Sequence, residues 1–326
     1  MKRVLTAGLL ALLGGSAQAQ RSDGRFYLPG SFNWSFHRTY PDAERLFHAF
    51  DYGHAVLYER LWTSGADVQA RLKQDFDFLT TDLLRRPPRF GIAEEAVMPG
   101  YARVAWRARQ MFHWAHELHR QIYDVYADER VPGPAKAALV ERITDSYLAN
   151  RANAFTSTPK SMALMDDAPY SQVFRSDYPE FNGLIWAYHW LQVGLYEPLI
   201  GAESPAARAE GIRSTLGRFW AMMDARPARF PELMPMTAGV APRFAARHPR
   251  AAAIFDNLHM MHDIISDILI SDRVPRNLKA KAIEAALAEF RDATRNTMSI
   301  QEWLEMPAMM GGVDRMGGVA WTPPVR

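Results

Sequence analysis

The sequence predicts an all-α protein, an internally duplicated helical bundle in which two four-helix units are related by a pseudo-twofold axis. Three observations lead to this prediction. Short motifs recur in the same order at offsets of 138 to 143 residues, which is typical of a repeated structural unit. Prolines divide the chain into segments of helical length. The long alternating runs of β-branched residues that indicate strands are missing from the sequence.

The first 19 residues have the pattern of a signal peptide. Lys2 and Arg3 form a basic start, a mostly apolar run covers residues 4–15, and Ala-Gln-Ala at residues 17–19 is a small-x-small cleavage site. The apolar run is too short for an ordinary membrane anchor. We therefore expect cleavage after Ala19 and a periplasmic or secreted protein without a membrane span. Residues 20–39 would form an N-terminal extension.

The duplication is expected from matched motifs. Tyr-Pro-Asp at residues 40–42 recurs as Tyr-Pro-Glu at residues 178–180, and Leu-Tyr-Glu at residues 57–59 recurs at residues 195–197, both at an offset of 138. An Arg-Pro-x-Arg-Phe motif and an Arg-Val-Pro motif recur further along at offsets of 140 and 143. The expected parts are repeat 1 over residues 40–160, repeat 2 over residues 161–297, and an irregular tail rich in Met, Gly and Pro over residues 298–326.

Each unit is expected to contain four helices. They cover residues 42–62, 66–84, 102–128 and 134–150 in repeat 1, and residues 179–199, 205–225, 250–271 and 276–294 in repeat 2. Pro132 and Pro275 divide the third helix of each unit from the fourth, because proline cannot continue a helix interior. The first and third helices of both units could form one central bundle, with the other helices outside.

The composition excludes several kinds of site. The chain has no cysteine, so disulfides and thiolate metal sites are excluded. The net charge of +2 and the even spread of arginine give no indication of nucleic-acid binding. The sequence contains no Gly-rich phosphate loop, no nucleophile-elbow motif and no C-x-x-C-H haem attachment motif. A metal would have to be held by His, Asp, Glu, Tyr or Met side chains.

A His-x-x-His pair occurs on the third helix of each unit. His116 and His119 coincide with His259 and His262 at an offset of 143. Residues three apart on a helix are neighbours on one face. A turn of about 100° per residue places the first pair and His262 on a buried face. His259 is expected at the margin of that face.

The first helix of each unit carries further candidate ligands along its apolar strip. The strip carries Asp51, His54 and Tyr58 in the first copy, and His189, Gln192 and Tyr196 at the corresponding places in the second copy. If the first and third helices of a unit pack side by side, several of these side chains meet in one small region. His48 lies off the strip.

These side chains favour a metal site in the bundle core. Burying six imidazoles costs free energy unless each finds a partner, and a metal satisfies several at once because neutral imidazole is the commonest metal ligand. Helical bundles build such sites from inward His and carboxylate side chains. Nitrogen and oxygen ligands fit iron or copper first, and manganese or zinc as further options. The candidate metal ligands are Asp51, His54, His116, His119, His189, Gln192, His259 and His262. A buried His–Tyr–Asp hydrogen-bond network without metal is the alternative interpretation.

We therefore expect an exported non-haem, metal-dependent oxidoreductase of the oxidase or oxygenase type. Tyr58 and Tyr196 could hydrogen-bond a ligand or carry redox chemistry. Two alternatives stay open. One is a carrier or electron-transfer protein that binds a metal or b-type haem, and the other is a non-catalytic helical scaffold with buried His networks. The sequence names no substrate, redox partner or oligomeric state.

Four carboxylates shared by the two copies are expected to play structural parts. Glu59 and Glu197 should pair with an arginine, for example one in the repeated Arg-Pro-x-Arg-Phe motif. Asp124 and Asp267 are expected to face outward into solvent, because their helical phase points away from the apolar face.

Overall fold

The computed structural model describes residues 34–323, which are helical or irregular apart from one isolated bridge between Lys160 and Thr297. The protein is therefore all-α over this range, as the sequence predicts. The signal peptide expected over residues 1–19 lies outside the described residues, and so does most of the expected extension over residues 20–39. Across the described part, every helix is too short or too polar to span a bilayer.

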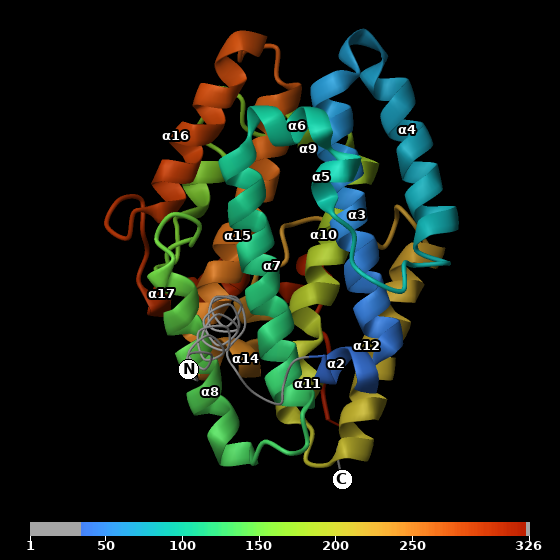
Figure 1. Cartoon of the computed structure of the whole chain (residues 1–326), viewed down its shortest axis with the longest axis vertical. Helices are drawn as coiled ribbons and strands as arrows, with labels where there is room; N and C mark the ends of the chain where they lie inside the picture. Colours follow the sequence, from blue (N-terminus) through green and yellow to red (C-terminus); the bar gives the residue numbers. More distant parts are fainter. Residues whose placement is uncertain (1–33, 324–326) are drawn as a thin grey trace, which may run out of the picture.

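Four long helical segments lie at the centre of the molecule (Figure 1). They are α3 (Pro41–Thr63), α7 (Trp106–Ala127), α10 (Pro179–Gly194) with its continuation α11 (Tyr196–Gly201), and α15 (Pro249–Ile270). Helix α15 contacts α3 and α7, helix α10 contacts α3, and helix α11 contacts α7. The two halves of the chain therefore share one core.

Four further helices lie outside this centre, and each packs on the central segment that it follows along the chain. They are α4 (Val68–Phe78) with a π-helical turn (Leu79–Leu83), α8 (Gly133–Ala149), α12 (Pro205–Asp224), and α16 (Lys279–Arg291) with a preceding 3-10 turn (Arg276–Leu278). Their bounds agree with the expected helices to within a few residues. Each has one buried face and one exposed face, so only the central segments can place side chains in the middle of the core.

Short helices, most of them outside the expected ranges, connect these elements. They are α2 (Ser35–Thr39), a 3-10 turn (Gly65–Asp67), α5 (Glu94–Val97), α6 (Pro99–Val104), a 3-10 turn (Met162–Met165), α9 (Val173–Asp177), α13 (Thr237–Val240) and α14 (Pro242–Arg247). Most of them lie just before a central helix. They pack on the ends and sides of the central segments, and the sequence pattern assigned no helix to most of these stretches.

Asp124 and Asp267 are buried, and the expectation that they face solvent is wrong. The reason is that α2 and α9 cover them. Asp124 accepts hydrogen bonds from the backbone N–H groups of Trp34 and Phe36, at 2.8 and 2.7 Å. Asp267 accepts the same two bonds from Gln172 and Phe174, both at 2.8 Å. Each carboxylate therefore satisfies free N–H groups at the start of a short helix.

Glu59 and Glu197 also bind helix starts. Glu59 accepts hydrogen bonds from the backbone of Gly100 and Tyr101, both at 2.9 Å, at the start of α6. Glu197 accepts a hydrogen bond from the backbone of Arg243, at 2.7 Å, and pairs with its guanidinium at 2.9 Å. The expected arginine partner is therefore absent for Glu59 among the described residues. For Glu197 it comes from α14, not from the repeated Arg-Pro motif.

The tail is helical over part of its length. Helix α17 (Ile300–Met309) begins with a capping box in which Ser299 and Glu302 bond each other's backbone N–H groups. A 3-10 turn (Val313–Met316) follows. Trp303 is buried and donates a hydrogen bond to Asp256 at 2.8 Å. The expectation of an irregular tail is therefore wrong over α17, which packs against the core.

Candidate metal centre

Six histidines meet where the central segments pack together. They are His54 from α3, His116 and His119 from α7, His189 from α10, and His259 and His262 from α15. None is more than 4% exposed. The expectation that His259 lies at the margin of a face is wrong, because α15 is buried on every side over residues 251–269 and so has no outward margin.

His54, His116 and His262 form the tightest group of potential ligands. One ring nitrogen of each lies within 4.8 Å of those of the other two. Ligands about 2.1 Å from one metal ion lie roughly 3 to 4 Å apart, so the separation of these three nitrogens is close to the spacing that one ion requires. The group draws on helices from both halves of the chain, since α3 and α7 precede α15 by more than a hundred residues.

Most ring nitrogens of the six histidines have no hydrogen-bond partner among the described residues. This holds for nine of the twelve, including both nitrogens of His54, His116 and His259. A buried polar atom without a partner costs about 1–3 kcal/mol, and native interiors contain few of them. Unpartnered buried ring nitrogens of this kind are compatible with a metal-binding site.

The six imidazoles are neutral at physiological pH. Burial lowers the pKa of His54 to about 3, and the neighbouring His116 adds to this effect. Burial likewise lowers the pKa of His116 to about 3, with Arg120 as the next cause. The pKa values of the other four also lie well below their ordinary value because of burial. Neutral imidazole is the form that binds a metal.

Two of the three histidines have a neighbour that can fix their orientation. His116 Nδ1 lies 3.3 Å from Asp51 Oδ1. His262 Nδ1 shares a hydrogen bond of 2.9 Å with His189 Nε2. A metal-ligating histidine commonly uses its second nitrogen in this way, which fixes the tautomer and directs the other nitrogen to the metal. Asp51 and His189 are therefore placed to support ligands as well as to act as ligands.

His119, His189 and His259 lie near the triad of His54, His116 and His262, but within the described residues they belong to no group of three His or acidic side chains that could hold one ion. His259 stacks on His189 at a ring separation of 4.0 Å. His119 Nδ1 hydrogen-bonds Tyr196 Oη at 2.9 Å, which leaves His119 Nε2 without a partner in the described part of the chain. Gln192 is fully buried, and neither its amide oxygen nor its nitrogen has a partner there.

Tyr58 and Tyr196 occupy matching positions around the six histidines. Tyr58 Oη lies 3.5 Å from the backbone oxygen of His262, and Tyr196 Oη lies 3.4 Å from that of His119. Each tyrosine thus reaches the second histidine of the His-x-x-His pair in the other half of the chain. Burial raises the pKa of both hydroxyls well above the ordinary value. Both phenols are therefore protonated at neutral pH.

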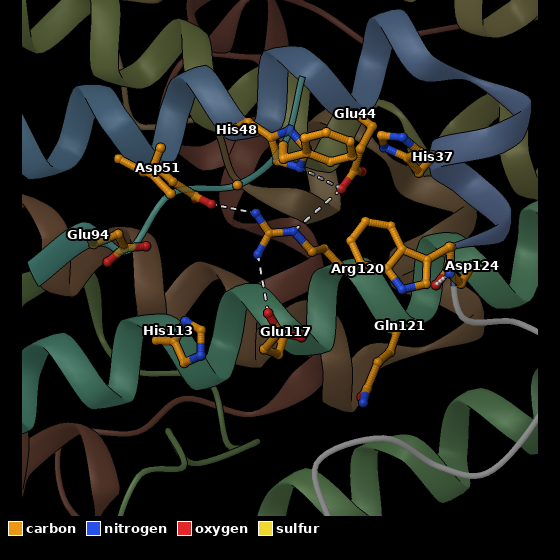
Figure 2. Close-up of a pocket in the computed structure, with 14 residues that line it drawn as sticks. His37, Glu44, His48, Asp51, Glu94, His113, Glu117, Arg120, Gln121 and Asp124 are labelled. Carbon is orange, nitrogen blue, oxygen red and sulfur yellow. Dashed lines mark hydrogen bonds and ion pairs between the residues drawn. The ribbon is translucent and has the colours of Figure 1, made fainter. Parts of the chain in front are cut away.

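A polar cavity of about 250 Å³ lies between α3 and α7, next to the triad. Figure 2 shows Arg120 at its centre, reaching from α7 toward α3. Arg120 contacts Asp51, and it also lies 3.5 Å from Glu44 and 3.4 Å from Glu117. The rim includes exposed residues such as Trp34, so the cavity opens to the surface. Asp51 connects the cavity to His116.

His48 and Glu94 are part of this cavity, although sequence reasoning did not select them. His48 is buried and lies 3.2 Å from Glu44. Glu94 is buried at the start of the short helix α5, and burial together with the nearby Asp51 raises its pKa to about 8. Glu94 lies in a connecting segment with no helical repeat around it, so periodicity could not reveal it. Its one signal is a Glu-Glu pair before a short apolar stretch.

Comparison with known proteins adds no relative. No protein-family model, curated protein or solved structure matches this chain. Function must therefore be argued from the chemistry of the site.

Proposed function

We propose that this protein holds a transition-metal ion at His54, His116 and His262 and acts as a non-haem, metal-dependent oxidoreductase of the oxidase or oxygenase type. The observation that carries the proposal is the convergence of three neutral imidazoles whose nitrogens, apart from His262 Nδ1, lack a hydrogen-bond partner among the described residues. Three imidazole ligands suit iron, copper or zinc, and manganese less well. Three protein ligands also leave coordination positions free for a small molecule.

The aromatic surroundings support redox chemistry over simple hydrolysis. A bound iron or copper ion would supply one-electron chemistry with dioxygen as the oxidant. Tyr58 keeps its phenolic proton at neutral pH and its ring centre lies 6.2 Å from that of His262. It is therefore placed to give up a proton together with an electron. Tyr196 holds the corresponding position beside His119.

A metal carrier or electron-transfer protein is the second candidate. The observation that favours it is the depth of the site, because the residues lining the cavity include Asp51 but none of the three histidines. A b-type haem fits less well. The ring centres of His54 and His262 lie 4.4 Å apart, and those of His189 and His259 lie 4.0 Å apart, in stacked pairs. A porphyrin has no space between such closely stacked rings.

We also propose that the two halves of the chain are copies of one unit. Equivalent contacts support this. Asp124 and Asp267 bind the starts of α2 and α9 in the same way. Lys136 donates to the backbone oxygen of Tyr126 at 2.7 Å, and Lys279, at the matching position, donates to that of Leu269 at 2.6 Å. The copy of the triad His54, His116 and His262 would then be Gln192, His259 and His119. The second site would thus lack one imidazole.

Metal analysis tests the proposal. We expect the full chain, purified from an exporting host and supplied with Fe²⁺ or Cu²⁺, to retain a stoichiometric metal after desalting. His262→Gln should weaken metal binding by about 100-fold. Substitution of a residue that only hydrogen-bonds a ligand already lowers metal affinity by about 10–100-fold. His248→Gln is the matched control, because His248 is equally buried but already bonds Tyr126 at 2.6 Å and faces Glu141 at 3.3 Å.

Three results separate the candidates. Dioxygen consumption by the metal-loaded protein with a reductant supports the oxidoreductase, provided that Tyr58→Phe slows it while the metal content is kept. Tight metal binding without turnover supports the carrier. A folded protein that takes up no transition metal, or a His262→Gln variant that binds metal as the wild type does, overturns the proposal and leaves the helical scaffold.

A further inference from the structure

We infer that Asp51, Glu94 and His116 form a second cation site at the inner end of the cavity, one that takes a hard divalent ion such as Mn²⁺ or Fe²⁺. One ligand atom of each residue lies within 4.8 Å of those of the other two. All three side chains are more than nine-tenths buried. The site shares only His116 with the triad and in that respect rests on the proposed function.

Asp51 and His116 each have a buried polar atom that points to a missing partner. Asp51 Oδ1 and His116 Nδ1 lie 3.3 Å apart, yet neither has a properly aligned hydrogen-bond partner within residues 34–323. The other carboxylate oxygen, Oδ2, is held by Arg120. Arg120 therefore fixes the orientation of the Asp51 carboxylate, and its other oxygen, Oδ1, stays available to bind a cation. A cation between these two atoms satisfies both at once.

Charge favours a cation at this position. Asp51, Glu94, Glu44 and Glu117 all line the cavity around Arg120 (Figure 2). Arg120 contacts three of these carboxylates, whereas the carboxylate of Glu94 has neither a hydrogen bond nor an ion pair with any described residue. One guanidinium thus faces four acidic groups. With a pKa of about 8, Glu94 is mostly protonated at neutral pH in the metal-free protein. A divalent ion that displaces this proton balances the negative charge of the acidic groups inside a largely buried cavity.

The donor set distinguishes this site from the triad. Two carboxylates and one imidazole suit Mn²⁺ or Fe²⁺, whereas three imidazoles suit copper, zinc or iron. The open rim of the cavity gives an ion a route from solvent that the triad lacks. His116 has two ring nitrogens, one facing Asp51, but a neutral imidazole offers a lone pair on only one of them at a time. Occupation of both sites at once therefore requires His116 to release its remaining N–H proton to solvent and bind as an imidazolate. Ion binding at one site should then change the affinity of the other.

Manganese binding to the full chain tests this inference. Mn²⁺ is titrated into metal-free protein, and the free ion is followed by its electron paramagnetic resonance signal. We expect one Mn²⁺ per chain, and at least a tenfold weaker affinity in Glu94→Gln. Glu95→Gln is the matched control, since Glu95 is the next residue, is partly exposed, pairs with Arg109 and belongs to neither group of potential ligands. Its affinity should equal that of the wild type.

His262→Gln separates the two sites. This variant should lose the triad metal but keep Mn²⁺, because His262 is no part of the carboxylate site. Equal Mn²⁺ binding by wild type and Glu94→Gln overturns the inference, and so does the absence of Mn²⁺ binding. Loss of Mn²⁺ in His262→Gln as well means one site only and also overturns it. Mn²⁺ binding that depends on Glu94, in a protein that binds no Cu²⁺ or Zn²⁺, supports this site and contradicts the triad.

Discussion

Individual buried hydroxyls around the histidines differ in whether they have a partner. Tyr196 Oη bonds His119 Nδ1 at 2.9 Å. Tyr188 is equally buried and lies beside His54, with a ring separation of 6.4 Å, but its hydroxyl has no partner among the described residues. The same chemical change, from Tyr to Phe, therefore removes a hydrogen bond at one position and an unsatisfied polar atom at the other.

We expect Tyr196→Phe to lower the unfolding free energy of the metal-free protein by about 1–3 kcal/mol, because His119 Nδ1 is left buried without a partner. Tyr188→Phe should be neutral or slightly stabilising, because the lost hydroxyl has no hydrogen bond to lose. Urea unfolding followed by circular dichroism measures both values. Equal destabilisation by the two substitutions would show that the Tyr196–His119 bond contributes nothing.

At the scale of elements, the short helices α2 and α9 depend on carboxylates from the long central helices. Asp124 on α7 and Asp267 on α15 each accept two backbone hydrogen bonds across more than eighty residues of sequence. Helices of five residues are too short to be stable alone. Their position therefore follows from these capping contacts and from the apolar residues that they bury, Phe36 and Phe174.

Asp124→Ala and Asp267→Ala should each lower the unfolding free energy by about 2 kcal/mol, since each removes two hydrogen bonds to a helix start. The measurement is best made at pH 8, above the pKa values that burial raises to about 7 and about 6. Asp145→Ala is the control. Asp145 is largely exposed and, among residues 34–323, pairs only with Arg250 on the surface, so its loss should change stability by less than about 0.5 kcal/mol. If Asp124→Ala or Asp267→Ala lowers the unfolding free energy as little as Asp145→Ala does, the capping role is contradicted.

The long helices were predictable from sequence, and the short ones were not. Prolines at or near the first position mark the starts of α3, α12 and α15, and an amphipathic pattern runs through α7. Helix α17 carried a readable capping box at Ser299 that sequence reasoning overlooked. Helices α2 and α5 have no period to detect, because four or five residues make little more than one turn.

The candidate ligands were predictable for the same reason, and their grouping was not. Helical phase places His54 and His116 on inward faces from sequence alone. Which nitrogens converge depends on how α3, α7 and α15 pack, and this is a tertiary property. The contribution of Glu94 depends on the path of a connecting segment. Sequence alone could not show that Asp51 can support His116 as well as act as a ligand. That follows from the 3.3 Å distance between Asp51 Oδ1 and His116 Nδ1.

At the scale of the whole molecule, the proposed duplication makes the core nearly but not fully symmetric. Under that symmetry, His116 and His262 of the triad correspond to His259 and His119, whereas His54 corresponds to Gln192. His119 Nε2 and both nitrogens of His259 have no partner in the described part of the chain. The set of side chains that corresponds to the triad therefore keeps two of the three imidazoles and differs at one buried side chain of similar size.

Gln192→His should restore the missing imidazole and create a second binding site for Zn²⁺. Glutamine and histidine have similar volumes, and volume-conserving core changes cost less than about 1.5 kcal/mol, so the fold should persist. We expect the Zn²⁺ stoichiometry, measured by titration against a chromophoric chelator, to rise by one ion per chain. Gln192→Met is the control, since it fills the space without adding a nitrogen ligand. Adding His259→Gln to Gln192→His should cancel the gain, because it removes another ligand of the same site. A folded Gln192→His protein with unchanged stoichiometry contradicts the correspondence between the two triads.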